Sequence, residues 1–334
     1  MDIAIIGLPR SGKTTIFNAV TRGSAEVAAY GSPQGKPNIG VAKVPDERLD
    51  VLTGMYRPRR TVPAEVVYVD IPAAPEGLGK TRGISGEFLN HLQRADALLV
   101  VSRAFEDPSV THIADTIDPF RDIETMMYEL AFSDLEILER RLSRIGDGFK
   151  GARGTERDAL AKEQALIERL KAALEGGAPV RDQSLTSDEQ RMLGGFQFLT
   201  GKPLIVVVNV GEDQIGDIPE IEERLAAEVA APRIRAAALC GKLEMELAQM
   251  DEADEQEFRE SLGAGESGLN RMIRVSYDVL DLVTFLTVGE DEVRAWPVTK
   301  GTPAAKAAGK IHSDLERGFI RAEVVKYADL VRCG

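Results

Sequence analysis

The segment from Asp2 to Thr21 constrains this chain more than any other. A short apolar run, Ile3 to Ile6, leads into a Gly-x-x-x-x-Gly-Lys-Thr loop, and an amphipathic segment follows it. This order of strand, glycine loop and helix forms a phosphate-binding loop, in which backbone N–H groups converge on phosphate oxygens beside the positive end of the helix. In such a loop Lys13 reaches the β- and γ-phosphates, and the Thr14 hydroxyl holds Mg²⁺. The segment therefore predicts a site for a nucleoside triphosphate with Mg²⁺. The residues assigned to this site are Gly7, Pro9, Arg10, Ser11, Gly12, Lys13, Thr14 and Thr15.

The composition of the 334 residues is that of an ordinary globular protein, with 43% hydrophobic and 28% charged residues. A net charge of −13 argues against a generally basic nucleic-acid coat and leaves local basic patches open. No apolar run approaches the ~20 residues that cross a bilayer, and no basic leader precedes the first apolar run. The cysteines and histidines provide no disulfide framework and no metal spacing. We therefore expect a cytoplasmic protein that binds neither DNA nor membranes.

Further apolar runs alternate with amphipathic segments, which predicts a mostly parallel α/β sheet with ligands at the carboxyl ends of its strands. Asp70 ends one predicted strand and is expected to hold Mg²⁺ directly or through water, as the second acidic partner of such sites. An ordinary aspartate at a strand end is the alternative, and the upstream phosphate loop favours the metal site. Residues 51–60 are predicted as a helix that runs into a basic turn. The predicted strands after the first are 39–44, 65–69, 97–101, 204–208 and 234–239.

Two segments late in the predicted sheet are assigned to the nucleotide base. Asn209-x-x-Glu212 follows the strand 204–208, where GTPases carry Asn-Lys-x-Asp and the aspartate accepts hydrogen bonds from guanine N1–H and the 2-amino group. Glu212 is one methylene longer than aspartate, and Val210 replaces the lysine. Guanine recognition should therefore be weakened, and adenine with its 6-amino donor becomes admissible. Three further candidates for cofactor binding follow the strand 234–239. The cofactor-binding residues in these two segments are Asn209, Glu212, Cys240, Gly241 and Lys242.

Between the strands 97–101 and 204–208, apolar residues repeat by three and four in two long runs that flank the glycine-rich segment 146–154. This spacing predicts an antiparallel helical hairpin inserted into the nucleotide domain. Basic residues gather toward its tip. A solvated charged face is the ordinary interpretation of such a cluster, and contact with the ribosome or structured RNA is the functional one. The basic residues are Arg140, Arg141, Arg144, Lys150 and Arg153.

The last part of the chain predicts a separate small module. After helices over 245–262 and 268–280, we expect strands over 282–287, 293–298 and 319–326, with a short helix over 303–311. A small sheet around one helix is of β-grasp type, here short of strands. The predicted organisation is a nucleotide domain in two parts, 1–121 and 199–279, a helical hairpin over 122–198, and an incomplete β-grasp module over 280–334.

Short motifs spread over nearly the whole chain recur together in one protein family. They are Gly7-Leu8-Pro9, Gly12-Lys13-Thr14, Ile16-Phe17-Asn18-Ala19, Pro45-Asp46-Glu47-Arg48-Leu49, Val69-Asp70-Ile71, Phe105-Glu106-Asp107, Asp118-Pro119, Asp122-Ile123-Glu124, Asn209-Val210-Gly211-Glu212, Ser267-Gly268-Leu269-Asn270-Arg271, Glu292-Val293-Arg294-Ala295-Trp296 and the segment 308–323. With these motifs the chain resembles the YchF (Obg-like) ATPase family. The resemblance implies a nucleotide domain with an inserted coiled coil, a C-terminal TGS domain, ATP preference over GTP, and association with ribosomes.

The chain departs from the family pattern at the nucleotide site. Arg10 stands where the family usually has asparagine, which in related potassium-stimulated NTPases helps to bind a monovalent cation beside the phosphates. We interpret the Arg10 guanidinium as a built-in replacement for that cation, with an Arg10 that points into solvent as the alternative. Gln34 falls where the Mg²⁺-sensing threonine would be, and Ala73 after Pro72 replaces a switch glycine, which should stiffen the backbone. His112 matches a family histidine and is the nearest candidate to orient water. A loop histidine bonded to backbone is the alternative.

Intact phosphate and Mg²⁺ residues beside altered switch segments predict firm nucleotide binding and slow hydrolysis. We expect a weak ATPase whose nucleotide state controls ribosome or RNA association through the hairpin tip and the TGS-like module. A hydrolysis-deficient, nucleotide-dependent binding protein is the alternative, and a GTPase is less expected because of Glu212. The catalytic candidates are Lys13, Arg10 and His112.

Overall fold

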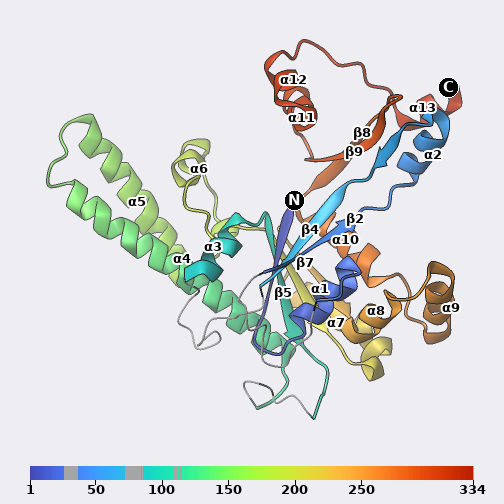
Figure 1. Cartoon of the computed structure of the whole chain (residues 1–334). Helices are drawn as coiled ribbons and strands as arrows, with labels where there is room; N and C mark the ends of the chain where they lie inside the picture. Colours follow the sequence, from blue (N-terminus) through green and yellow to red (C-terminus); the bar gives the residue numbers. More distant parts are fainter. Residues whose placement is uncertain (26–36, 72–83, 85, 109–111, 113–114, 334) are drawn as a thin grey trace.

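The computed structural model describes residues 1–25, 37–71, 84, 86–108, 112 and 115–333 (Figure 1). A six-stranded sheet lies at its centre, in the order β2-β4-β1-β5-β6-β7. Strand β2 is antiparallel to β4, and every other neighbouring pair in this sheet is parallel. The predicted mostly parallel α/β sheet is therefore confirmed. The strands are β1 (Asp2–Ile6), β2 (Asn38–Lys43), β4 (Glu65–Asp70), β5 (Ala97–Arg103), β6 (Leu204–Asn209) and β7 (Ile234–Leu239).

Helices cover both faces of the sheet, which explains why its inner strands are apolar without interruption. Every residue of β5 and β6 is buried, as is usual for parallel strands packed between two layers. One face packs against α1 (Lys13–Thr21) and α10 (Gly268–Val279). The other packs against α3 (Gly86–Arg94), the first turns of α4 (Pro119–Gly148) and α7 (Ile218–Glu228). Because the inner strands are parallel, their carboxyl ends lie at one edge of the sheet.

The helical insertion leaves the nucleotide domain between β5 and β6 and projects away from the sheet (Figure 1). Its long arms are α4 and α5 (Thr155–Glu175), and their apolar stripes form a core of their own. The chain returns through η1 (Val180–Asp182) and α6 (Ser187–Leu193). The predicted antiparallel hairpin is confirmed. Within the described part of the chain, no helix is long and apolar enough to cross a membrane.

A buried carboxylate fixes the base of the hairpin to the sheet. Asp134 on α4 accepts hydrogen bonds from Leu199 N at 2.8 Å, Thr200 N at 2.7 Å and Thr200 Oγ1 at 2.6 Å. Burial raises the pKa of Asp134 to about 6 in spite of these bonds, which act in the opposite direction. The carboxylate thus holds α4 directly beside the segment that enters β6.

The C-terminal module contains a three-stranded sheet in the order β3-β9-β8. The strands predicted over 282–287 and 293–298 are present as β8 (Leu282–Thr287) and β9 (Glu292–Thr299), which form an antiparallel pair. Helices α11 (Ala304–Ile311), α12 (Ser313–Arg317) and α13 (Tyr327–Cys333) follow them. The strand predicted over 319–326 is wrong, since this segment forms no strand and Ile320 is 91% exposed. Its β-branched residues favour a strand, but β9 is already paired on both sides, by β8 and β3.

The third strand of that sheet comes from the N-terminal half of the chain. Strand β3 (Arg60–Val62) pairs in parallel with β9, and helix α2 (Glu47–Tyr56) packs on the same sheet through Leu49 and Leu52. The helix predicted over 51–60 is wrong in position, because Asp46 caps its start and Arg57 ends it in a left-handed conformation.

The helix predicted over 245–262 is also wrong in extent. It is divided into α8 (Gly241–Leu247) and α9 (Glu252–Leu262), since the Asp251 carboxylate caps a new helix by accepting from Ala253 N and Asp254 N. A short helix η2 (Glu212–Asp217), which was not predicted, precedes α7. The early start of α8 places Lys242 in its first turn.

Candidate functional site

The phosphate loop between β1 and α1 is packed tightly against its neighbours. A Cβ on Gly7 would lie 2.3 Å from the carbonyl oxygen of Val101, and a Cβ on Gly12 would lie 2.2 Å from Asn209 Nδ2. Gly12 also has φ +88°, which side chains rarely adopt. These two positions therefore require glycine, and they place the loop at the carboxyl ends of β1 and β5. Within the loop, Pro9 and Thr15 are half-buried, and Ser11 is buried.

Lys13 is folded back onto this loop. Its Nζ donates to the carbonyl oxygens of Gly7 and Leu8, each at 3.1 Å, and the side chain is buried. Burial lowers the pKa of Lys13 to about 8, with the charge of Asp70 acting in the opposite direction. Because little water surrounds the Lys13 ammonium, its attraction to anionic oxygens would be strong.

Thr14 and Asp70 come together as the sequence predicts, although they belong to different elements. Asp70 Oδ2 accepts from Thr14 Oγ1 at 2.8 Å and from Asn38 Nδ2 at 3.1 Å. Asp70 is fully buried, and its second oxygen, Oδ1, has no hydrogen-bond partner among the described residues. A buried carboxylate oxygen without a donor is costly, and together with a hydroxyl it is the hard oxygen donor set that Mg²⁺ prefers. The residues present therefore fit a magnesium ion.

Asn209 joins the phosphate loop to the loop that follows β7. Its Nδ2 donates to Ser11 O at 3.1 Å, and its Oδ1 accepts from Gly241 N at 3.0 Å. Both ends of the side-chain amide are thus bound to backbone. The sequence analysis assigned Asn209 to the base. In this structure the Asn209 side chain links the phosphate loop to the loop after β7.

Glu212 and Lys242 lie on the solvent side of this joint. Lys242 Nζ lies 2.9 Å from Glu212 Oε1, and the hydrogen bond that Lys242 donates to this carboxylate raises the pKa of Lys242. Cys240, at the start of the same loop, is buried, and burial raises the pKa of its thiol. The exposed pair can therefore meet a ligand, whereas Cys240 is a packed thiol at the foot of the loop.

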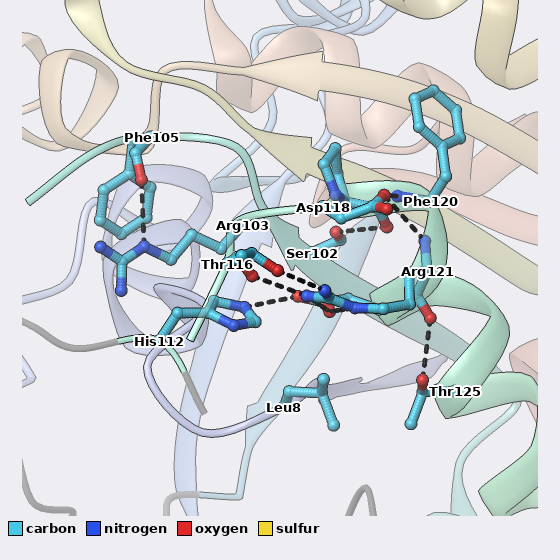
Figure 2. A network of polar contacts seen from close by, with 12 residues as sticks. Leu8, Ser102, Arg103, Phe105, His112, Thr116, Asp118, Phe120, Arg121 and Thr125 are labelled. Atoms are coloured by element: carbon cyan, nitrogen blue, oxygen red, sulfur yellow. Dashed lines mark hydrogen bonds and ion pairs between the residues drawn. The ribbon is translucent and has the colours of Figure 1, made fainter. Parts of the chain in front are cut away.

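A polar network ties the loop after β5 to the start of α4 (Figure 2). His112 is buried, and its Nε2 lies 2.7 Å from Asp122 Oδ2. The other oxygen, Asp122 Oδ1, accepts from Arg121 Nη2 at 2.9 Å, and Arg121 also donates to Thr116 O at 2.7 Å. The alternative given for His112 was a bond to backbone, and the partner of its Nε2 in this structure is instead a carboxylate.

Arg103, at the end of β5, is a functional candidate that the sequence interpretation missed. Its guanidinium lies over the Phe105 ring at 4.6 Å, and its Nε donates to Phe105 O at 3.0 Å (Figure 2). Arg103 is only 2% exposed. Burial lowers its pKa, and the positive charge of Arg10 acts in the same direction. An arginine that follows the apolar run 97–101 so closely is the signal that could have indicated it.

Arg10 itself is half-buried and has φ 66°. Asparagine adopts this left-handed conformation more readily than arginine, which fits the asparagine that the family carries here. The switch candidates Gln34, Pro72 and Ala73 lie outside the described residues.

Comparison with known proteins identifies the family. The profile of the 50S ribosome-binding GTPases matches residues 2–131, and that of the YchF GTPase C-terminal domain, a protein of unknown function, matches residues 282–334. The chain is 41% identical to the ribosome-binding ATPase YchF of Bacillus subtilis, across 100% of this chain and 91% of the relative. The chain belongs to the YchF family. Obg-like ATPase 1 of Caenorhabditis elegans is 35% identical, across 100% of this chain and 84% of the relative.

The solved structures agree with this assignment to the YchF family. The Schizosaccharomyces pombe YchF GTPase superposes with a TM-score of 0.81 at 30% identity, covering 99% of this chain and 89% of that one. The YchF fold, with a P-loop domain, a long helical insertion and a C-terminal domain, is therefore confirmed for this chain. Its P-loop domain is a nucleotide-binding domain.

Proposed function

We propose that this chain binds ATP with Mg²⁺, hydrolyses it slowly, and associates with the ribosome in a way that depends on its nucleotide state. The juxtaposition of Lys13, Thr14 and Asp70 at one edge of the sheet carries the proposal, because no described residue donates a hydrogen bond to the buried Asp70 Oδ1. Relatives named ribosome-binding ATPases support the choice of nucleotide and of partner. A cytoplasmic protein follows from the same proposal.

Different residues of the site would bind the phosphates and the metal ion. Lys13 would leave the carbonyls of Gly7 and Leu8 and place its ammonium on the β- and γ-phosphates, where the buried position strengthens the attraction. Thr14 Oγ1 and Asp70 would hold the metal, with Asn38 keeping the carboxylate oriented. When bound, Mg²⁺ neutralises charge on the phosphate oxygens.

Lys13 makes nucleotide binding depend on pH. The pKa of Lys13 is about 8 in the free protein, and phosphate oxygens would raise it, so that binding above pH 8 takes up a proton. The Kd for ATP should therefore rise with pH above 8, by up to about tenfold per unit. Titration calorimetry between pH 7.5 and 9.5, in buffers of different ionisation enthalpy, measures both the Kd and the proton uptake.

An arginine in place of Lys13 is the matched control, because its guanidinium stays protonated over this range. Any nucleotide binding that K13R retains should lack the proton uptake. A wild-type Kd that stays constant from pH 7.5 to 9.5 would show that the free Lys13 is already charged.

His112 is the proposed water-orienting residue, with Asp122 holding its ring. A hydrolysis-deficient binding protein is the second candidate function, favoured by the same contact, because the buried Asp122 carboxylate occupies one ring nitrogen of His112. Single-turnover hydrolysis of labelled ATP and GTP separates the two functions. Slow ADP formation that His112→Ala abolishes supports the ATPase, and tight ATP binding without product supports the second candidate.

The ribosome is the proposed partner, through the hairpin tip and the C-terminal module. Three of the basic residues are engaged within the hairpin: Arg141 with Glu163, Arg140 with Glu136, and Lys150 with Asp147. Arg144 and Arg153 are exposed and supply the positive charge in the proposal. Co-sedimentation of the protein with purified ribosomes, with ATP and without it, tests the association. Equal pelleting in both states would contradict control by nucleotide.

Arg10 is proposed to replace a monovalent cation beside the phosphates. Hydrolysis should then proceed at the same rate in potassium and in sodium, since the charge is already part of the chain. Arg10→Asn should lower the rate in sodium and restore a response to potassium, about tenfold if one phosphate contact is lost. Wild-type hydrolysis that rises strongly with potassium over sodium would contradict this role.

A further inference from the structure

An exposed ion pair bridges the two loops to which the nucleotide base is assigned. Lys242 Nζ, in the first turn of α8, lies 2.9 Å from Glu212 Oε1 in η2. The lysine side chain is 68% exposed and the glutamate side chain 55%. Neither side chain belongs to a hydrophobic core. Packing of the core therefore does not explain why Lys242 and Glu212 form an ion pair.

The buried side chain of Asn209 fixes the position of the ion pair between Lys242 and Glu212. Asn209 Oδ1 accepts from Gly241 N at 3.0 Å, directly before Lys242, and Asn209 ends the strand that leads to Glu212. A Cβ on Gly241 would lie 2.9 Å from Asn209 Oδ1 and 2.8 Å from Ile16 Cδ1. The backbones that carry the two charges are therefore fixed relative to each other and to α1.

The two purine bases present different patterns to such a pair. Guanine offers the O6 acceptor beside two adjacent donors, N1–H and the 2-amino group. The two donors need two acceptors, and a free carboxylate supplies two oxygens. Adenine offers one donor, the 6-amino group, beside one acceptor, the ring N1. A carboxylate with one oxygen held by an ammonium presents one acceptor beside one donor. That pattern complements adenine and leaves one donor of guanine unmatched.

We propose that Lys242 is a specificity-determining residue, which selects adenine over guanine by holding Glu212 Oε1 and by presenting its own ammonium beside it. This inference rests on the proposed function and names the residue that sets its base preference. The selection is electrostatic and exposed, so it weakens as ionic strength rises.

Equilibrium binding of ATP, GTP and ITP, each with Mg²⁺, to wild type and Lys242→Met tests the inference. Inosine keeps O6 and N1–H and lacks the 2-amino group, so wild type should bind ATP and ITP more tightly than GTP, whose 2-amino group has no acceptor. In Lys242→Met the ratio of GTP to ATP affinity should rise about three- to tenfold, and GTP should bind more tightly than ITP, because the free carboxylate accepts from both guanine donors. Lys242→Arg should keep the preference of wild type, because it retains a donor to Glu212.

Lys150→Met is the matched control, because Lys150 is also exposed and ion-paired, with Asp147 at 2.7 Å, but lies at the hairpin tip. It should leave the GTP to ATP ratio unchanged. An unchanged ratio in Lys242→Met, or a wild type that binds ATP and GTP equally, overturns the inference and leaves ATP binding intact. A wild type that binds none of the three nucleotides overturns the proposed function itself.

Discussion

Lys13→Ala is expected to weaken ATP binding by about 100-fold, since charge-assisted hydrogen bonds to two phosphates are worth about 3 kcal/mol together. The effect should be this large because Lys13 is buried, and little solvent can replace its charge at the site. The free protein should remain folded, because the ammonium donates only to the Gly7 and Leu8 carbonyls. Titration with a fluorescent ATP analogue measures the loss.

Lys150→Ala serves as the control for this experiment, because it removes an exposed lysine charge far from the loop and should leave ATP affinity unchanged. Circular dichroism of both variants checks that the fold is retained. If Lys13→Ala binds ATP as tightly as wild type, the phosphate loop does not hold the triphosphate, and the assignment of the site fails.

Asp70→Asn is expected to change stability and nucleotide binding in opposite directions. In the free protein it replaces a buried carboxylate, whose Oδ1 accepts from no residue in the described part of the chain, by a neutral amide of the same shape. This change should stabilise the fold by about 1 kcal/mol and raise the melting temperature by about 2 °C. The same change removes a metal ligand, so the Mg²⁺-dependent part of ATP affinity should fall by about 100-fold. Thermal melts without nucleotide and ATP titrations with Mg²⁺ or EDTA measure both effects.

Asp134→Asn provides a matched contrast at the base of the hairpin. Asp134 is also fully buried, but its oxygens accept three hydrogen bonds from Leu199 and Thr200. An amide there loses acceptor capacity, so this variant should be less stable by about 1 to 3 kcal/mol and should bind Mg²⁺ and ATP normally. If Asp70→Asn instead loses stability and keeps its magnesium dependence, Asp70 is an ordinary structural aspartate.

The fold was predictable where local pattern and topology agree. The inner strands are buried on both faces and therefore appear as unbroken apolar runs, and the hairpin shows apolar residues at helical spacing. The prediction failed where a distant partner decides the outcome. Residues 60–62 form a strand only because β9 lies beside them, and residues 319–326 have strand-like composition but pair with none of the strands of that sheet.

The candidate site was also predictable in part and unpredictable in part. Thr14 and Asp70 were paired in advance because the phosphate loop and the end of the neighbouring strand meet in every fold of this kind. The contact between His112 and Asp122, the backbone bonds of Asn209, and the burial of Arg103 depend on how loops close over the sheet edge. Residue spacing carries little information on such closures, and so these roles required the structure.

The most direct test of the central claim is the affinity of the wild-type protein for ATP and for GTP, measured by calorimetry with Mg²⁺ at pH 7.5. The geometry of Lys13, Thr14 and Asp70 predicts saturable binding of one ATP per chain, and Glu212 paired with Lys242 predicts that ATP binds more tightly than GTP. Tighter binding of GTP, or no binding of either nucleotide, would contradict the account.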